Sequence, residues 1–243
     1  MTSQRLLHTA FDARANADPD RVAVEIDCTW LSYGELQSLA QTLSVLLVRL
    51  GVSATSTVAV FMERCLEVPV AMLGVLYVGA AILPLADVDE NVYIADVHVL
   101  LTTHAARPRL LATNVPIVLY VDVEVLAANP LHLELEHKLP TPEQAAYVLQ
   151  GHSVITHEEM VLATTYNQAI PGFNPFHVEM WRALTRGHEV DLADHEIPIA
   201  LFVEMPTFSS NGVQSCVVGS RPTDEQGPSR EYSSGMYIPT IAL

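Results

Sequence analysis

The feature that most constrains the fold is a run of nineteen residues without a charge, at 68–86. A candidate membrane span needs about eighteen such residues, so the length alone permits one. However, Pro69 and Pro84 bracket the run and acidic residues follow it, whereas membrane spans carry lysine or arginine on the cytoplasmic side. Buried segments of α/β proteins read as continuous apolar runs of the same kind. The run therefore predicts a buried helix over 67–78 that leads into a buried strand over 80–85.

Strands and helices alternate on both sides of this run. Ser32 and Glu35 have the spacing of a capping box, and leucines at helical spacing follow them as far as Gly51. Apolar segments rich in β-branched residues predict strands at residues 22–26, 57–61, 97–102, 116–122 and 145–149. This alternation is typical of an α/β fold with a mostly parallel sheet and flanking helices.

The charge balance excludes several classes of function. The chain has 28 acidic and 12 basic residues, a formal charge of −16, and its single lysine is Lys138. A surface this acidic repels nucleic-acid backbones and anionic lipid heads, so neither nucleic acid nor a membrane is an expected partner. Sites that bind ATP usually place lysine against phosphate, and only one lysine is available.

The cysteines and the first residues indicate the compartment. Three cysteines stand far apart and form no C-x-x-C pair, which favours a reducing environment over a disulfide framework. The first twenty residues lack the apolar run of a signal peptide. The predicted location is therefore cytoplasmic.

Five motifs occur in the order of a known family. They are AFDARANADPDRVAV near Leu7, LSYGEL at 31–36, VAVFMERCLEVPVAMLGVLYVGAAILPL at 58–85, the segment 145–149 with VITH at 154–157, and FNPFHVEMWRAL at 173–184. Together they resemble the adenylation domain of non-ribosomal peptide synthetases, within the acyl-adenylate-forming (AMP-binding) superfamily. The resemblance covers roughly residues 7–190.

The resemblance implies a fold, a chemistry and cofactors. It implies an incomplete N-terminal subdomain of the adenylate-forming fold, because the family's later nucleotide-binding motifs and its C-terminal lid domain are not matched. It also implies ATP-dependent adenylation of a carboxylate, with ATP and Mg²⁺ as cofactors. We expect a partial adenylation domain at 7–206 and an irregular tail at 207–243, which is rich in Ser, Gly and Pro.

The phosphate-binding loop departs from the family pattern. In the family, a strand is followed by Y-T-S-G-[ST]-T-G-x-P-K-G, whose glycines let backbone N–H groups approach phosphate. Here only four residues, 150–153, separate the two flanks. Four residues are too few for a phosphate cradle and a turn, so the nucleotide-binding residues reduce to the remnants Gly151, Ser153 and Thr156.

The acyl-binding region departs as well. By resemblance, Asn174, Pro175 and Val178 fall where the family lines its acyl pocket. Asn174 stands at the aspartate that binds the α-ammonium group of amino-acid substrates, and an amide supplies no charge for that bond. Pro175 and the bulky Phe176 alter the lining, which favours a pocket filled by side chains. No catalytic residue is assigned.

Two other constellations have structural explanations. The sequence 151–155 approaches the nucleophile elbow G-x-S-x-G, but Ile155 replaces the last glycine, so a shortened phosphate loop is the better interpretation of Ser153. A metal site would have to use the cluster His188, Asp191, Asp194, His195 and Glu196, or His152 with His157. Neither has the spacing of a known metal motif, so no metal is expected.

Two functional hypotheses follow. The first is a truncated adenylation protein of secondary-metabolite biosynthesis, without autonomous adenylation activity, whose partner is a larger synthetase or another pathway enzyme. The alternative is an active ATP-dependent acyl- or aminoacyl-adenylate-forming ligase that works with a partner polypeptide.

Overall fold

A computed structural model describes residues 6–85, 97–110, 114–131, 140–149 and 153–193. A six-stranded sheet forms the centre of this part. Its strands are, in spatial order, β6 (Ile117–Tyr120), β5 (Val97–Thr102), β3 (Thr57–Phe61), β4 (Ala81–Pro84), β7 (Ala145–Val148) and β8 (Val154–Thr156). The predicted boundary at residue 206 and the tail 207–243 lie outside the described residues.

The sheet is parallel except at one edge. β3 pairs in parallel with β4 and β5, β5 with β6, and β4 with β7 through Ile82 and Tyr147. Only β8 runs antiparallel, paired with β7. The predicted α/β class and mostly parallel sheet are confirmed, and the bounds predicted for the strands 57–61 and 97–102 agree with the structure.

A second, three-stranded sheet joins distant parts of the chain. Its order is β2 (Thr29–Ser32), β1 (Val22–Ile26) and β9 (Val190–Asp191). β1 and β2 form a hairpin whose turn places Asp27 and Cys28 at positive φ. β9 pairs in parallel with β1, so the end of the described chain lies against its beginning.

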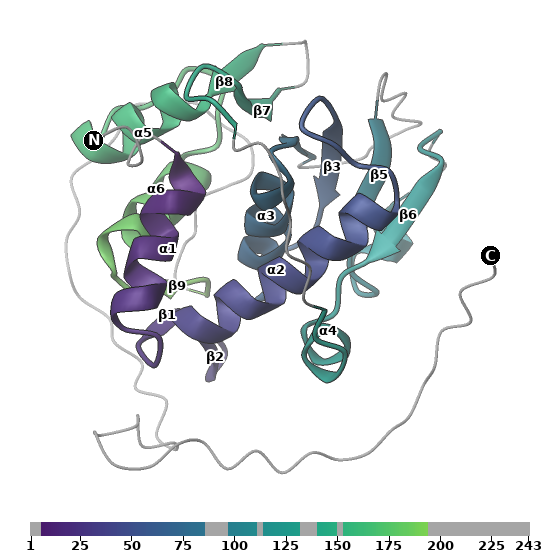
Figure 1. Ribbon diagram of the computed structural model, residues 1–243, viewed down its shortest axis with the longest axis horizontal. Helices are drawn as coiled ribbons and strands as arrows, with labels where there is room; N and C mark the ends of the chain where they lie inside the picture. Colours follow the sequence, from purple (N-terminus) through teal and green to yellow (C-terminus); the bar gives the residue numbers. More distant parts are fainter. Residues whose placement is uncertain (1–5, 86–96, 111–113, 132–139, 150–152, 194–243) are drawn as a thin grey trace. The chain divides into compact units, whose positions relative to one another are not determined.

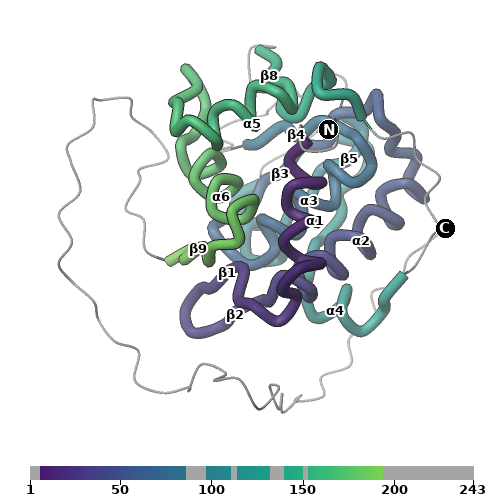
Figure 2. Tube along the Cα trace, turned by 60° about the vertical axis from the view of Figure 1, so that its left-hand side comes forward, coloured from purple at the N-terminus to yellow at the C-terminus, as the bar shows by residue number. Residues whose placement is uncertain are grey.

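Six α-helices of the described part pack around one face of the large sheet. They are α1 (Leu7–Ala17), α2 (Tyr33–Arg49), α3 (Glu67–Val78), α4 (Val123–Ala128), α5 (His157–Tyr166) and α6 (Pro175–Arg186). Figure 1 shows α2 running obliquely in front of the sheet and α3 standing beside β3, and Figure 2 shows α1 packed over α3 beside α2. The predicted capping box of Ser32 and Glu35 starts α2.

The uncharged run folds as predicted into a buried helix and a strand. Within α3 all residues from Val68 to Leu76 are buried. Gly79 ends the helix in the left-handed region at φ 81°, which glycine adopts without steric cost. In the part of the chain that the structure describes, no helix has both the length and the apolarity that crossing a bilayer requires.

A half-buried network links three of these helices. Tyr77 on α3 donates a hydrogen bond to Asp12 Oδ1 on α1 at 2.5 Å, and Gln37 Nε2 on α2 donates to the same oxygen at 2.8 Å. Desolvation raises the pKa of Asp12, although the two hydrogen bonds oppose the shift. The Tyr77 hydroxyl thereby links α3 to α1.

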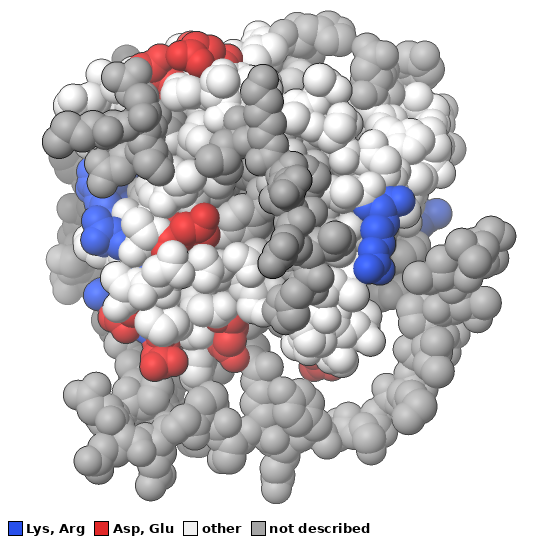
Figure 3. Space-filling model, in the orientation of Figure 1, with Lys and Arg blue, Asp and Glu red and all other residues white. Residues whose placement is uncertain are grey.

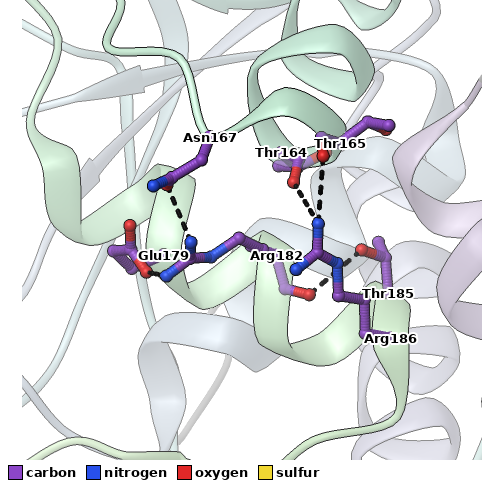
Figure 4. Close-up of polar contacts among 7 residues, drawn as sticks. All are labelled: Thr164, Thr165, Asn167, Glu179, Arg182, Thr185 and Arg186. Carbon is purple, nitrogen blue, oxygen red and sulfur yellow. Dashed lines mark hydrogen bonds and ion pairs between the residues drawn. The ribbon is translucent and has the colours of Figure 1, made fainter.

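Two arginines of α6 bind the end of α5 (Figure 4). Arg186 Nη2 donates to the carbonyl oxygens of Thr164 and Thr165 at 3.2 and 3.0 Å, and Arg182 Nη1 donates to Asn167 Oδ1 at 2.7 Å. The last carbonyls of a helix have no partner within the helix and carry partial negative charge. The Arg186 guanidinium therefore caps the end of α5, and both arginines fix α6 against it.

Three histidines are buried as neutral groups. His8 on α1 and His157 on α5 have ring centroids 5.8 Å apart, and His177 lies within α6. Among the described residues, neither ring nitrogen of His157 has a hydrogen-bond partner. The Nδ1 atoms of His8 and His177 also have no partner there. Desolvation lowers each pKa to about 4, with a further contribution from His8 at His157.

These histidines predict loss of stability in acid. The pKa of each histidine is about 4 in the folded state and 6.5 in the unfolded chain. Between pH 4 and pH 6.5 the unfolded state therefore binds more protons than the folded state. Stability is therefore full above pH 6.5 and falls as the pH drops toward 4. We expect urea unfolding at stepped pH to show this, with His177→Phe removing roughly 3 kcal/mol of the pH dependence. The exposed His98→Phe is the control, and a pH dependence unchanged by His177→Phe would contradict the prediction.

Candidate functional site

The predicted phosphate-loop remnant is the connection between β7 and β8. The Leu149 N–H donates to the Ser153 carbonyl at 2.8 Å, next to the strand pair Val148 and Val154. This hydrogen bond closes the hairpin, so only residues 150–152 lie between its donor and acceptor residues. Gly151 lies among these three and is outside the described residues.

Thr156 caps the helix that follows the hairpin. Its hydroxyl oxygen accepts a hydrogen bond from the Glu159 N–H at 3.2 Å, and its own N–H donates to Glu159 Oε2 at 2.8 Å. This reciprocal capping box satisfies N–H groups at the start of α5. The start of a helix is the position where backbone N–H groups and the helix dipole favour an anion. In this chain the Glu159 carboxylate occupies that position.

An open groove of about 320 Å³ lies beside the hairpin. Its walls come from β8, α5 and the segment after α5, and they are Leu149, Ser153, Val154, Ile155, Glu159, Leu162, Ala163, Gln168, Ala169, Ile170 and Pro171. Ser153 lines this groove, whereas Asn174, Pro175 and Val178 do not. Of the predicted site residues that the structure describes, only Ser153 lines this groove.

Asn174, Pro175 and Val178 lie together at the start of α6. Asn174 is the N-cap, and its Oδ1 accepts a hydrogen bond from the Phe176 N–H at 2.9 Å. Pro175 occupies the first helical position, where a missing N–H costs nothing. Val178 is buried in the core. The side chains of Asn174 and Val178 are thus engaged in the helix cap and the core.

A closed aromatic cluster fills the space between β7 and α6. It consists of Tyr147, Phe173, Phe176, His177 and Trp181, all of them buried. Ring centroids are 4.8 Å apart for Tyr147 and Phe173, and 5.6 Å for Phe176 and His177. Trp181 Nε1 donates to the Tyr147 hydroxyl at 2.6 Å, and burial raises the pKa of that hydroxyl. The only signal of this cluster in the sequence was the aromatic segment FNPFH at 173–177.

One positive charge lies beside the cluster. The Arg64 guanidinium, from the loop after β3, stands 5.1 Å from the centroid of the Phe176 ring. A cation over the face of an aromatic ring is attracted by the ring's negative face. Phe176 therefore joins the loop after β3 to the start of α6.

Metal ligands do not converge in the part of the chain that the structure describes, where His, Cys, Asp and Glu form no group of three. Of the cluster near the end of α6, His188 and Asp191 are described, and Asp191 Oδ1 accepts a hydrogen bond from the Ala193 N–H at 2.8 Å. Asp194, His195 and Glu196 lie outside the described residues.

Comparison with known proteins identifies the family. The model of the AMP-binding enzyme family matches residues 11–161, more than half of the chain. Adenylate-forming reductase 03009 of Coprinopsis cinerea is 33% identical over 155 residues, 59% of this chain and 15% of the relative. Tyrocidine synthase 1 of Brevibacillus parabrevis is 40% identical over 79 residues, which are 32% of this chain and 7% of the synthase.

Solved structures show the same fold. The N-terminal subdomain of Klebsiella oxytoca NpsA aligns with a TM-score of 0.61 at 18% identity. The alignment covers 76% of this chain and 54% of the NpsA chain. The alignment with the fused adenylation–PCP di-domain NpsA-ThdA has a TM-score of 0.62 and covers 39% of the NpsA-ThdA chain. The chain thus spans well under two thirds of these proteins. It belongs to the AMP-binding enzyme family and contains part of an adenylate-forming domain of the non-ribosomal peptide synthetase type.

Proposed function

We propose that this chain supplies the scaffold of an adenylation domain in non-ribosomal peptide or related secondary-metabolite biosynthesis and has no adenylation activity of its own. The closed β7–β8 hairpin carries the proposal. The bond from Leu149 to Ser153 leaves three residues to connect the strands, and three residues cannot surround a triphosphate with backbone N–H groups. Gly151, Ser153 and Thr156 are in this proposal the remnants of the loop.

The residues at the hairpin do not fit the family's cofactors. The family implies ATP and Mg²⁺, and a phosphate at the start of α5 would need the helix N–H groups that the Thr156–Glu159 capping box uses. The Glu159 carboxylate would also lie against the phosphate, and like charges at such distances repel. Lys138, the single lysine, lies outside the described residues and contributes nothing to this test.

The acyl-binding region supports the same proposal. Phe176 and His177 are buried beside Tyr147 and Trp181, so aromatic side chains fill the space next to Asn174, Pro175 and Val178. A substrate carboxylate or ammonium group there would displace well-packed rings rather than enter a cavity. In this proposal the three residues mark the position of the acyl pocket without forming one.

The proposed partner is a larger synthetase or another enzyme of the same pathway. The relatives that match this chain are much longer polypeptides, of which it spans 15% or less in the cases given above. A scaffold without its own nucleotide site acts through association, and the net charge of −16 favours a partner with complementary basic groups.

The first prediction concerns nucleotide chemistry. Calorimetry with MgATP at millimolar concentration is expected to give no saturable heat, and amino-acid-dependent pyrophosphate exchange is expected to equal the protein-free background. Glu159→Gln removes the charge but keeps the capping box, so it is expected to remain inactive because the hairpin stays closed. A complete adenylation domain measured in parallel is the positive control. Exchange above background by the wild-type chain would refute the proposal.

The second prediction tests whether the aromatic cluster is core rather than a pocket. Trp181→Phe removes the bond to Tyr147 and leaves a cavity, so it is expected to lower the free energy of unfolding by about 2–4 kcal/mol. Trp30→Phe, at a half-buried position, is the matched control and is expected to cost less than about 1 kcal/mol. Urea unfolding followed by circular dichroism measures both. Equal costs for the two variants would show that the cluster is not a packed core.

A further inference from the structure

A buried pair of histidines connects the first helix of the described chain to α5. His8 of α1 and His157, the first residue of α5, have ring centroids 5.8 Å apart and an interplanar angle of 78°. His8 is 3% exposed, and His157 is fully buried. Figure 2 shows the start of α1 lying close to α5. The two rings therefore lie in the contact between two helices that are far apart in the sequence.

The surroundings of the pair favour neutral rings. A neutral imidazole has one N–H donor and one acceptor nitrogen, whereas a protonated ring has two N–H donors. In the part of the chain that the structure describes, no hydrogen-bond partner reaches either ring nitrogen of His157 or Nδ1 of His8. A proton on such a nitrogen would add a buried charge without an acceptor, next to a second buried ring, at a high cost in free energy. In water the same charge would be solvated.

The charged and titratable groups on the neighbouring elements have partners of their own. Tyr77 of α3 contacts His8 edge-on, with ring centroids 5.9 Å apart, but its hydroxyl donates to Asp12. The others are Glu35 and Glu159 in capping boxes, Arg14 on the Thr185 carbonyl, Arg182 with Glu179 and Asn167, Arg186 on the Thr164 and Thr165 carbonyls, and Tyr147 with Trp181.

The nearby carboxylates do not compensate a proton on the pair. Figure 3 shows acidic side chains at the surface over the region of α5 and β8. Glu158 and Glu159 follow His157 directly, yet the pKa of His157 is lowered, by burial first and by His8 second. Burial also lowers the pKa of His8, although Asp12 lies one turn farther along α1. The contact between α1 and α5 is therefore made by neutral rings.

The two helices that the pair joins are anchored by few buried side chains. α1 and α5 each bury four residues, and one of the four is a histidine of the pair. By contrast, α2 buries nine residues and α3 buries ten, and neither set includes a histidine. Elements with few buried contacts open at a lower free energy than the core does. A charge on the pair therefore weakens α1 and α5 directly and leaves the packing of α2 and α3 intact.

We propose that the contact between His8 and His157 joins α1 to α5 only while both rings are neutral, and that acid separates these two helices while α2 and α3 stay packed on the sheet. Each ring that reaches water gains a proton in acid, which shifts the equilibrium toward the open form. Asp12 acts in the opposite direction. Desolvation raises its pKa, so acid favours its buried, folded state. The acid sensitivity of the contact therefore comes from the two histidines.

Hydrogen exchange of the full chain, followed by mass spectrometry at stepped pH between 6.5 and about 4, tests the proposal. As the pH falls, the protection factors of α5 amides are expected to drop about tenfold per pH unit for each histidine that gains a proton on opening. The amides of α2 and α3 are expected to stay protected at pH values at which those of α1 and α5 exchange. This comparison within the wild-type chain needs no variant.

Two variants assign the effect to the pair. His8→Phe and His157→Phe keep a ring and remove the buried nitrogens, so both are expected to fold at neutral pH. Each is expected to remove about tenfold per pH unit from the change in α5 protection, because one proton fewer is bound on opening. Circular dichroism at neutral pH checks that each variant is folded.

His177→Phe is the matched control. His177 is also buried, with a pKa lowered to about 4, but it contacts Tyr147 and Phe173 instead of the pair. Its substitution is expected to leave the pH dependence of α5 exchange unchanged. The proposal is overturned if α2 and α3 lose protection together with α5 at every pH, or if α5 protection does not change with pH. It is also overturned if neither variant of the pair alters the pH dependence, or if His177→Phe alters it as much.

Discussion

The packing of α3 between α2 and the parallel sheet is the constraint on which the rest of the structure depends. α3 connects β3 to β4, so its position fixes the pairing of the two central strands. A Cβ atom on Gly74 would lie 2.9 Å from Leu43 Cδ2 and 3.2 Å from the Ala40 carbonyl oxygen of α2. The two helices approach this closely only because Gly74 has no side chain. The burial of α3 therefore depends on its close contact with α2 at Gly74.

Long-range polar contacts attach the remaining elements to this unit. The Tyr33 hydroxyl lies 3.1 and 2.8 Å from the carbonyl oxygens of Leu184 and His188, and Arg14 Nε donates to the Thr185 carbonyl at 3.1 Å. These bonds satisfy carbonyls in the last turn of α6 and just after it. Together with the pairing of β1 and β9, they hold α6 against α1 and the start of α2.

Several residues at or beside the positions that the family resemblance indicated serve the fold. Thr156 and Glu159 complete a helix cap, and Asn174 caps the next helix. Tyr147, His177 and Trp181 pack together between β7 and α6. Each of these contacts also holds an element of the fold in place.

The sequence alone determined the secondary structure around the core and the family. The bounds of the strand 57–61, the helix 67–78 and the strand 97–102 follow from periodicity and from glycine and proline positions, because local burial patterns and backbone sterics set them. The short loop was equally visible, since a deletion is read directly from the spacing. Only the tertiary structure decided which buried groups meet. Tyr147 bonds to Trp181, 34 residues away, and Tyr33 to Leu184, 151 residues away. Periodicity reports that a side chain is buried, but its partner depends on how the helices cross the sheet.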